Sequence, residues 1–150
     1  MVIVVSILAG CGGAGKANWQ QVHGANFTFQ APAGWTVTGT AASSGPINRV
    51  QVNAFRLVHA FKQSERAAAA RELDGVAGQL AQQLKGKVVG RRTVAVGGAD
   101  AREYVIDHDS LTEEITFVLR GKQEYELLCR RAKDADDAAC RKLVASFRPG

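Results

Sequence analysis

The sequence predicts an α+β fold in which an antiparallel sheet carries a long middle helix and a C-terminal helix. Three observations lead to this class. Apolar and polar residues alternate in short segments before residue 60 and again between residues 87 and 130, which is the period of a half-buried strand. Between these regions the period becomes that of a helix, and a second helical stripe closes the chain. Strands and helices grouped in this order are typical of α+β domains.

The composition suits one globular domain and does not favour a nucleic-acid partner. The chain has 150 residues, of which 46% are hydrophobic, and its formal net charge is +5. The basic residues are spread along the chain, whereas a nucleic-acid-binding domain concentrates them on one stripe. We therefore expect a domain that works near an anionic surface and has no nucleic-acid partner.

The apolar run MVIVVSILAG ends at Cys11. It is far shorter than the roughly 20 residues of a membrane-spanning helix, and it has the length of a signal-peptide core. A buried N-terminal strand is the alternative, because Val and Ile favour strands. The glycines after Cys11 favour a tether over a strand. We predict a signal peptide over residues 1–10, with its basic start upstream of Met1, and a flexible tether over residues 11–25.

The stretch Leu8-Ala9-Gly10-Cys11 resembles the lipobox of bacterial lipoproteins. In that family a diacylglyceryl group is attached to the cysteine thiol and the chain is cut just before this cysteine. The resemblance implies that Cys11 is the site of lipid attachment. It also implies a protein anchored in the cell membrane at its extracytoplasmic face.

The globular domain is expected over residues 26–150. Residues 27–30 and 35–38 alternate like strands, and the Pro-Ala-Gly between them predicts a hairpin. A loop is expected at residues 41–46, where Ser, Gly and Pro gather. A longer strand follows, reaching to about His59, with Val50, Val52 and Ala54 on one face.

The rest of the domain is expected to hold a helix, a meander and a second helix. Helical spacing from Ser64 predicts a helix of about 20 residues. Four strands then follow, separated by turns, and Asp134 or Asp136 is expected to cap the last helix. The helical stripes are Leu73, Val76, Ala77, Leu80 and Leu84, then Ala139, Cys140, Leu143, Val144 and Phe147; the strands are 87–96, 101–107, 112–120 and 123–130.

If Cys11 carries lipid, two cysteines remain, Cys129 and Cys140. In an oxidising compartment these two thiols can form a disulfide, and Cys140 lies on the apolar face of its helix, where a strand cysteine can meet it. Two free buried thiols are the alternative. Their spacing fits neither a CxxC redox motif nor a zinc site.

The motifs FTFQAPAGW at residues 27–35 and ACRKLVASF at residues 139–147, with the long helix and meander between them, resemble the PsbP-like α/β/α sandwich. Exported actinobacterial lipoproteins of that fold often carry a similar C-terminal cysteine pair. The resemblance implies an antiparallel sheet between helices. It does not select a function, because this fold serves several.

The strongest polar cluster is Asp107-His108-Asp109, with Glu113 and Glu114 nearby. Carboxylates and an imidazole could hold a divalent cation, but a solvated turn is the favoured interpretation. Basic groups at residues 85–92 and 130–133 could contact lipid headgroups or keep a strand edge soluble. We expect neither a metal nor a cofactor, and the sequence contains no recognisable nucleophile with its base.

These patterns predict a lipid-anchored extracytoplasmic accessory or binding protein of the cell envelope, without enzymatic activity. Its expected contacts are the membrane, through the anchor, and an envelope protein. The alternative is a secreted carrier that binds an apolar or anionic small ligand between sheet and helix. A hydrolase would require a concave site that joins a histidine to a nucleophile.

Overall fold

A computed structural model describes residues 18–150. Its elements are β1 Trp19–His23, β2 Phe27–Pro32, β3 Thr36–Thr38, β4 Ala41–Ser44, β5 Asn48–Arg56, the 3-10 turn η1 Gln63–Glu65, α1 Arg66–Gln83, β6 Lys87–Val96, β7 Ala99–His108, β8 Leu111–Arg120, β9 Gln123–Ala132, α2 Ala138–Ser146 and β10 Arg148–Pro149.

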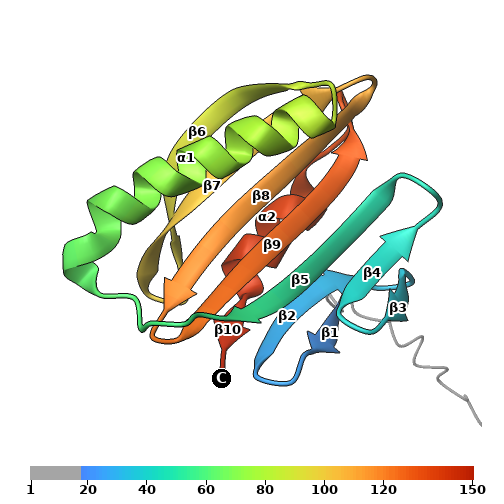
Figure 1. Cartoon of the computed structure of the whole chain (residues 1–150). Coiled ribbons are helices and arrows are strands. Elements are labelled where there is room, and N and C mark those ends of the chain that lie inside the picture. The colour runs from blue at the N-terminus through green and yellow to red at the C-terminus, as the bar shows by residue number, and fades with distance from the viewer. Residues whose placement is uncertain (1–17) are drawn as a thin grey trace, which may run out of the picture.

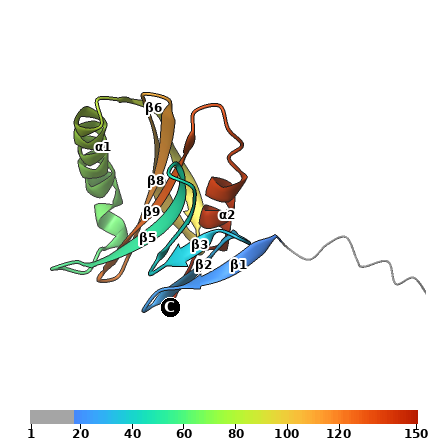
Figure 2. The ribbon, with the colours of Figure 1, turned by 90° about the vertical axis from the view of Figure 1, so that its right-hand side faces the viewer.

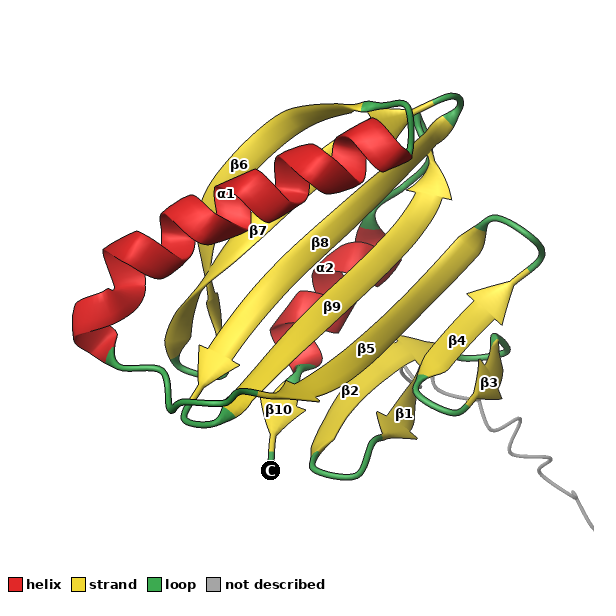
Figure 3. Ribbon diagram, in the orientation of Figure 1, coloured by secondary structure: helices red, strands yellow, loops and turns green. Residues whose placement is uncertain are grey.

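The centre of the molecule is a seven-stranded antiparallel sheet of order β3-β4-β5-β9-β8-β7-β6, which we call the large sheet (Figure 1). Helix α1 crosses one face of it. On the other face lie α2 and a small sheet of order β1-β2-β10 (Figures 2 and 3). The predicted α+β class with two covering helices is confirmed. No helix within residues 18–150 has both the length and the apolarity needed to cross a membrane.

The middle strands of the large sheet bury side chains on both faces. In β8, Phe117 contributes to the cluster under α1, while its neighbour Val118 belongs to the cluster under α2. In β9, Leu127 and Cys129 also face α2. Successive residues of a strand point to opposite faces, so the long apolar runs in this part of the sequence need a covering layer on each side.

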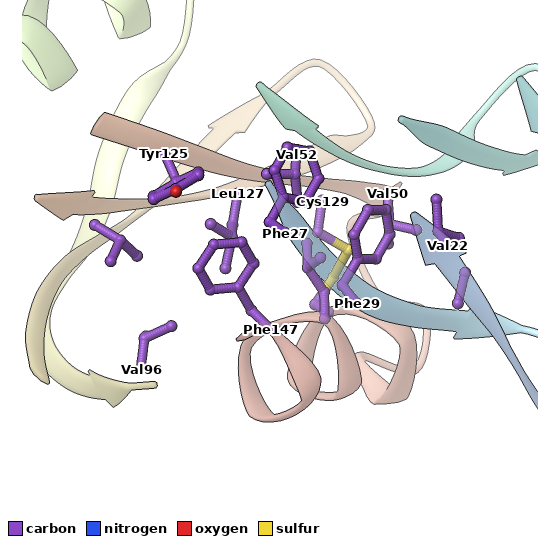
Figure 4. Packing of buried hydrophobic residues seen from close by; sticks show 14 of the residues in the cluster. Val22, Phe27, Phe29, Val50, Val52, Val96, Tyr125, Leu127, Cys129 and Phe147 are labelled. Carbon is purple, nitrogen blue, oxygen red and sulfur yellow. A yellow bond between two sulfur atoms is a disulfide. The ribbon is translucent and has the colours of Figure 1, made fainter. Parts of the chain in front are cut away.

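The main core lies between the large sheet, α2 and the small sheet (Figure 4). Aromatic rings fill it: Phe27 contacts Tyr125 edge to face at 5.8 Å between ring centres, and Tyr125 contacts Phe147 at 5.1 Å. Such pairs each add about 0.5 to 1.5 kcal/mol beyond the area they bury. This cluster therefore joins β2, β9 and the residue that follows α2.

Helix α1 packs through small residues. Ala77 and Ala81 are its buried positions, whereas Val76, which we expected on the inward stripe, is 45% exposed. Leu73, Leu80 and Leu84 lie half-buried beside the second cluster. Because alanine side chains are short, the helix lies close to Tyr104 and Ile106 of β7. With Ala77 and Ala81 facing the sheet, the neighbouring Val76 faces outward.

The predicted tether is too long, because β1 lies within it. Val22 is 1% exposed and pairs across the small sheet with Phe29. The described fold therefore begins at Trp19 and not at Asn26. The segment has one inward apolar residue between polar ones, too weak an alternation to predict a strand without its partner β2.

The predicted hairpin between residues 27–30 and 35–38 is also wrong. Strand β2 pairs with β1 and β10 in the small sheet, whereas β3 pairs with β4 in the large sheet. Gly34, with φ of 86°, sits in the turn where the chain passes from one sheet to the other. Strand β2 has β1 on one edge and β10 on the other, so β3 finds no free edge there along the paired residues.

Two further boundaries differ from expectation. The loop predicted at residues 41–46 contains β4, whose Ala41 and Ala42 are buried because they pair with β5 next to the core. Strand β5 ends at Arg56, where its pairing with β9 ends, and Ala54 and Phe55 are exposed. Helix α2 begins at Ala138, and its N-cap is Asp137, not Asp134 or Asp136 as we predicted. Asp136 still contributes, because its Oδ1 accepts a hydrogen bond from the backbone N–H of Ala138 at 2.6 Å.

The role of β1 can be tested with two matched substitutions. We expect Val22→Ala to lower the free energy of unfolding by about 2 kcal/mol, because it removes buried methyl groups and leaves a void. Val37→Ala, at a position 42% exposed in β3, should change it by less than about 0.5 kcal/mol. Urea unfolding of both variants measures the difference, and equal midpoints would contradict the placement of β1 in the fold.

Candidate ligand-binding site

A cavity of about 650 Å³ opens between the first half of α1 and the large sheet; we call it the α1 cavity. This volume falls within the range of small-molecule sites, about 300 to 1,000 Å³. The lining residues come from η1 and the segment before it, from α1, and from β6, β7 and β8: Phe61, Gln63, Arg66, Ala67, Ala69, Ala70, Leu73, Thr93, Gly98, Ala99, Asp100, Ala101, Arg102, Phe117 and Leu119.

Its apolar wall follows from the alternation in β8 and from the alanine run of α1. Phe117 and Leu119 are two residues apart, so both point toward α1. Opposite them the helix presents Ala70 and Leu73. Short side chains at this end of the helix do not fill the space above the sheet, and the cavity results.

An ion pair stands at the mouth of the cavity. Arg66 Nη1 donates to Asp100 Oδ2 at 2.6 Å and so joins the start of α1 to the start of β7. Both side chains are more than half exposed, at 54% and 52%. Water and salt screen such a pair, so it adds little to stability and can open at small cost.

A second, more sheltered network joins the middle of α1 to β7. Asp74 of α1 accepts hydrogen bonds from Tyr104 Oη at 2.5 Å and from Arg102 Nη2 at 2.9 Å. These two donors hold the pKa of the Asp74 carboxyl below its usual range. The same contact with Asp74 raises the pKa of Arg102, and burial raises the pKa of Tyr104.

One donor of this network lacks an acceptor. The Nε of Arg102 is buried and makes no hydrogen bond, and it is the sole side-chain atom of this kind among residues 18–150. Buried polar groups are nearly always paired, so an exception calls for an explanation. Because Arg102 also lines the α1 cavity, the orphaned donor and the cavity belong to one site.

The structure does not group the side chains of Asp107, His108 and Asp109, the residues that we considered as metal ligands while favouring a solvated turn. Asp107 accepts a hydrogen bond from Thr112 Oγ1 at 2.7 Å, while His108 Nε2 lies 3.3 Å from Glu113 Oε1. Asp109 occupies the turn before β8 with φ of 52°. In the described part of the chain no three His, Cys, Asp or Glu side chains are grouped to hold a metal ion.

The two C-terminal cysteines do meet. A disulfide joins Cys129 of β9 to Cys140 of α2, with the Cα atoms 5.4 Å apart, and it lies within the main core. The pairing is the one we expected if both thiols are oxidised. Cys11, the predicted lipid site, and the signal peptide over residues 1–10 lie outside the described residues.

The basic groups that we considered for lipid contact separate into two kinds. Arg130, Arg131 and Lys133 form ion pairs with Glu113, Glu114 and Asp107, which supports a structural role for them. Lys85, Lys87 and Arg91 lie on or beside β6, the edge strand of the large sheet, and Arg92 pairs there with Glu103. Charged residues of this kind protect a strand edge from further pairing.

From the sequence we considered a ligand between sheet and helix as the alternative, but we identified none of the charged residues that line the α1 cavity. One signal was present: Arg102, Tyr104 and Ile106 share one face of β7, and a basic residue on an otherwise apolar face is unusual. The cavity itself had no such signal, because it depends on how far α1 stands from β8.

Comparison with known proteins identifies the fold. No family model and no curated protein matches the sequence. A solution structure of cyanobacterial PsbP (CyanoP) from Synechocystis sp. PCC 6803 superimposes with a TM-score of 0.66 at 14% identity, over 95% of this chain and 99% of that one. The chain therefore has the PsbP-like fold that its motifs predicted.

A crystal structure of a protein from Bacteroides thetaiotaomicron is similar too, with a TM-score of 0.59 and 12% identity over 89% of this chain. The chain spans about half of that protein, 48% of its length. At these identities the likeness concerns the fold, and function has to be argued from the site.

The Asp74 network makes a pH-dependent contribution to stability. Asp74→Asn should lower the free energy of unfolding at pH 7 by about 1 kcal/mol, because two hydrogen bonds to a carboxylate weaken. The pKa of the Asp74 carboxyl is lower in the folded protein than in the unfolded chain. Its contribution to stability is therefore complete above about pH 5 and is lost as the pH falls through the pKa of the folded protein.

Thermal unfolding of both proteins between pH 7 and pH 2 measures this effect. The melting temperatures of wild type and Asp74→Asn should converge toward the acid end. Asp100→Asn, which weakens the exposed pair at the mouth, is the control and should cost much less at pH 7. A gap for Asp74→Asn that stays constant over the range would contradict the proposed stabilisation.

Proposed function

We propose that this chain is a lipid-anchored, non-catalytic binding protein on the extracytoplasmic face of the cell membrane. The disulfide between Cys129 and Cys140 is the observation that carries this proposal. It is 2–3% exposed at each cysteine and joins a strand to a helix inside the core. Cytosolic thiols are kept reduced, so a structural disulfide is typical of an exported protein.

The remaining cysteine, Cys11, supports the anchor. It follows the apolar run directly, at the position that a lipobox requires. Seven residue steps separate it from Asn18, so the fold would stay within about 25 Å of the acylated residue. The diacylglyceryl group on the cysteine thiol supplies two acyl chains. Two chains are enough for stable membrane attachment, whereas a single chain gives only weak, reversible binding.

A binding role agrees better with the α1 cavity than a catalytic one. Among the described residues that line it, the cavity has no serine, cysteine or histidine. Thr93 has no histidine beside it in the lining to act as its base, and the carboxylate of Asp100 is paired with Arg66. The charged groups of the lining, Arg66, Arg102 and Asp100, can orient a ligand. In this proposal the protein serves as an accessory factor to an envelope protein and performs no chemistry itself.

A second candidate function is that of a carrier for a small apolar or anionic ligand. The α1 cavity favours it, because it lies between sheet and helix and joins an apolar wall to arginine donors. Such a carrier could be anchored or released. The two functions are therefore compatible, and they require separate tests.

The anchor predicts a change of location on substitution of one residue. In cells that process lipoproteins, the wild-type chain should float with membranes in a density gradient, and Cys11→Ser should not. A double variant, Cys129→Ser with Cys140→Ser, controls for effects of cysteine loss and should still float if it folds. Flotation of Cys11→Ser equal to that of the wild type would contradict lipid attachment.

The compartment predicts the oxidation state of the other two cysteines. Protein isolated from its native location, denatured and alkylated without reductant, should carry no label on Cys129 or Cys140. After reduction each should take up one alkyl group, which peptide mass analysis detects. Label on both cysteines before reduction would contradict an oxidising location.

A further inference from the structure

We infer that the α1 cavity binds a single-chain amphiphile that carries one anionic group, with the anion held by Arg102. This inference rests on the carrier function proposed above and names the chemistry of its ligand. Three observations support it: the charged groups that line the cavity, the unpaired donor of Arg102, and the apolar surface beside that donor.

The charged residues that line the cavity are two arginines, Arg66 and Arg102, and one carboxylate, Asp100. Asp74 lies beyond Arg102 and holds it from the helix side. Asp100 lies at the exposed mouth and is paired with Arg66. With Asp74 included the four charges cancel, but Asp74 is not part of the lining, so the wall itself presents two guanidinium groups and one carboxylate. Such a wall offers more hydrogen-bond donors to an anion than acceptors to a cation.

The unpaired Nε of Arg102 requires an acceptor. A guanidinium has five N–H donors in a rigid plane, and Asp74 accepts from Nη2. A carboxylate or phosphate oxygen placed beside the guanidinium would satisfy the remaining side of the fork. The Arg102 side chain keeps 27% of its surface exposed, so a ligand can reach the side chain without displacement of α1. Nε itself is buried, and it meets the ligand only after a shift of the side chain.

Arg102 is also held ready for such a ligand. Asp74 orients its guanidinium from one side, and the guanidinium carbon lies 5.8 Å from the centre of the Tyr104 ring. A side chain fixed by its neighbours loses little freedom when a ligand binds. A carboxylate or phosphate forms charge-assisted hydrogen bonds with the guanidinium that a neutral head group does not match, and we expect a neutral ligand to bind about tenfold more weakly or worse.

The remaining wall of the α1 cavity is apolar and suits an apolar chain. Phe117 is the cross-strand neighbour of Arg102, and Leu119 lies two residues further along β8. Phe61 and Leu73 close the cavity from the helix side. A chain of about ten carbons would cover these side chains while its head group stays at Arg102, and the volume of about 650 Å³ accommodates such a ligand.

Three probes with the same ten-carbon chain separate head-group charge from chain burial: decanoate, decanol and decyltrimethylammonium, each below its micelle concentration. Isothermal titration should use the full chain with Cys11→Ser, purified without detergent, so that no acyl group competes. We expect decanoate to bind at least tenfold more tightly than decanol, and the cation not to bind. Decyl phosphate should bind with the same affinity as decanoate if the negative charge alone decides binding. A clearly higher affinity for decanoate assigns the ligand to carboxylates, and a clearly higher affinity for decyl phosphate assigns it to phosphate esters.

Decanol that binds as tightly as decanoate would overturn the anionic assignment and leave the carrier function supported. Absence of binding by all four probes would overturn both. Flotation of the lipidated wild type remains a separate result, because it depends on Cys11 and not on the cavity.

Substitutions locate the site. Arg102→Gln should weaken decanoate binding by roughly ten- to a hundredfold and leave decanol within about threefold. The matched control is Arg141→Gln, which breaks an exposed ion pair with Asp137 on α2, far from the cavity lining, and should change neither. Ala70→Phe fills the cavity without a change of charge and should abolish binding of both ligands. Decanoate binding that survives Ala70→Phe at full strength would place the ligand elsewhere.

Discussion

The structure depends on the need to cover both faces of the central strands. Strands β7, β8 and β9 carry apolar side chains at successive positions, so one layer of cover cannot remove them from water. Helix α1 supplies one layer. The other is composite, made from α2 and from the small sheet around β2. The disulfide and the aromatic contacts of Phe27, Tyr125 and Phe147 join this second layer to the sheet.

The two layers are built differently, and their difference explains where the cavity lies. The layer under α2 is filled by aromatic rings and contains most of the largest fully buried side chains, although Tyr104 lies under α1. The layer under α1 relies on alanines, which approach the sheet closely at Ala77 and Ala81 but leave space where α1 begins. Polar contacts join this half of the helix to β7: the exposed Arg66–Asp100 pair at its start and the more sheltered contact of Asp74 with Arg102 near its middle. The α1 cavity, to which we assign an anionic amphiphile, is thus present because apolar side chains do not fill the space between the start of α1 and the sheet.

Periodicity predicted the meander and both helices because the long strands and α1 repeat their patterns over nine residues or more. Short elements failed for the opposite reason. Strand β1 has one buried apolar residue, Val22, and β4 consists of small residues, so neither contrasts enough with a loop. The assignment of β2 and β3 to different sheets depends on distant partners, β10 and β5, which local sequence does not reveal. For the same reason Arg102 and Asp74, 28 residues apart, could not be paired from the sequence.

Strand β2 joins the two ends of the described chain, since β10 pairs with it through Arg148 and Pro149, and the N–H of Gly150 donates to the Asn26 carbonyl at 2.6 Å. The small sheet can be completed only when the final residues are present. Because the pairs Thr28–Arg148 and Phe27–Pro149 join residues far apart in the sequence, the loop-closure cost of this sheet is high. We therefore expect the small sheet to form late in folding, with Phe27 and Phe29 exposed until Arg148 and Pro149 reach β2.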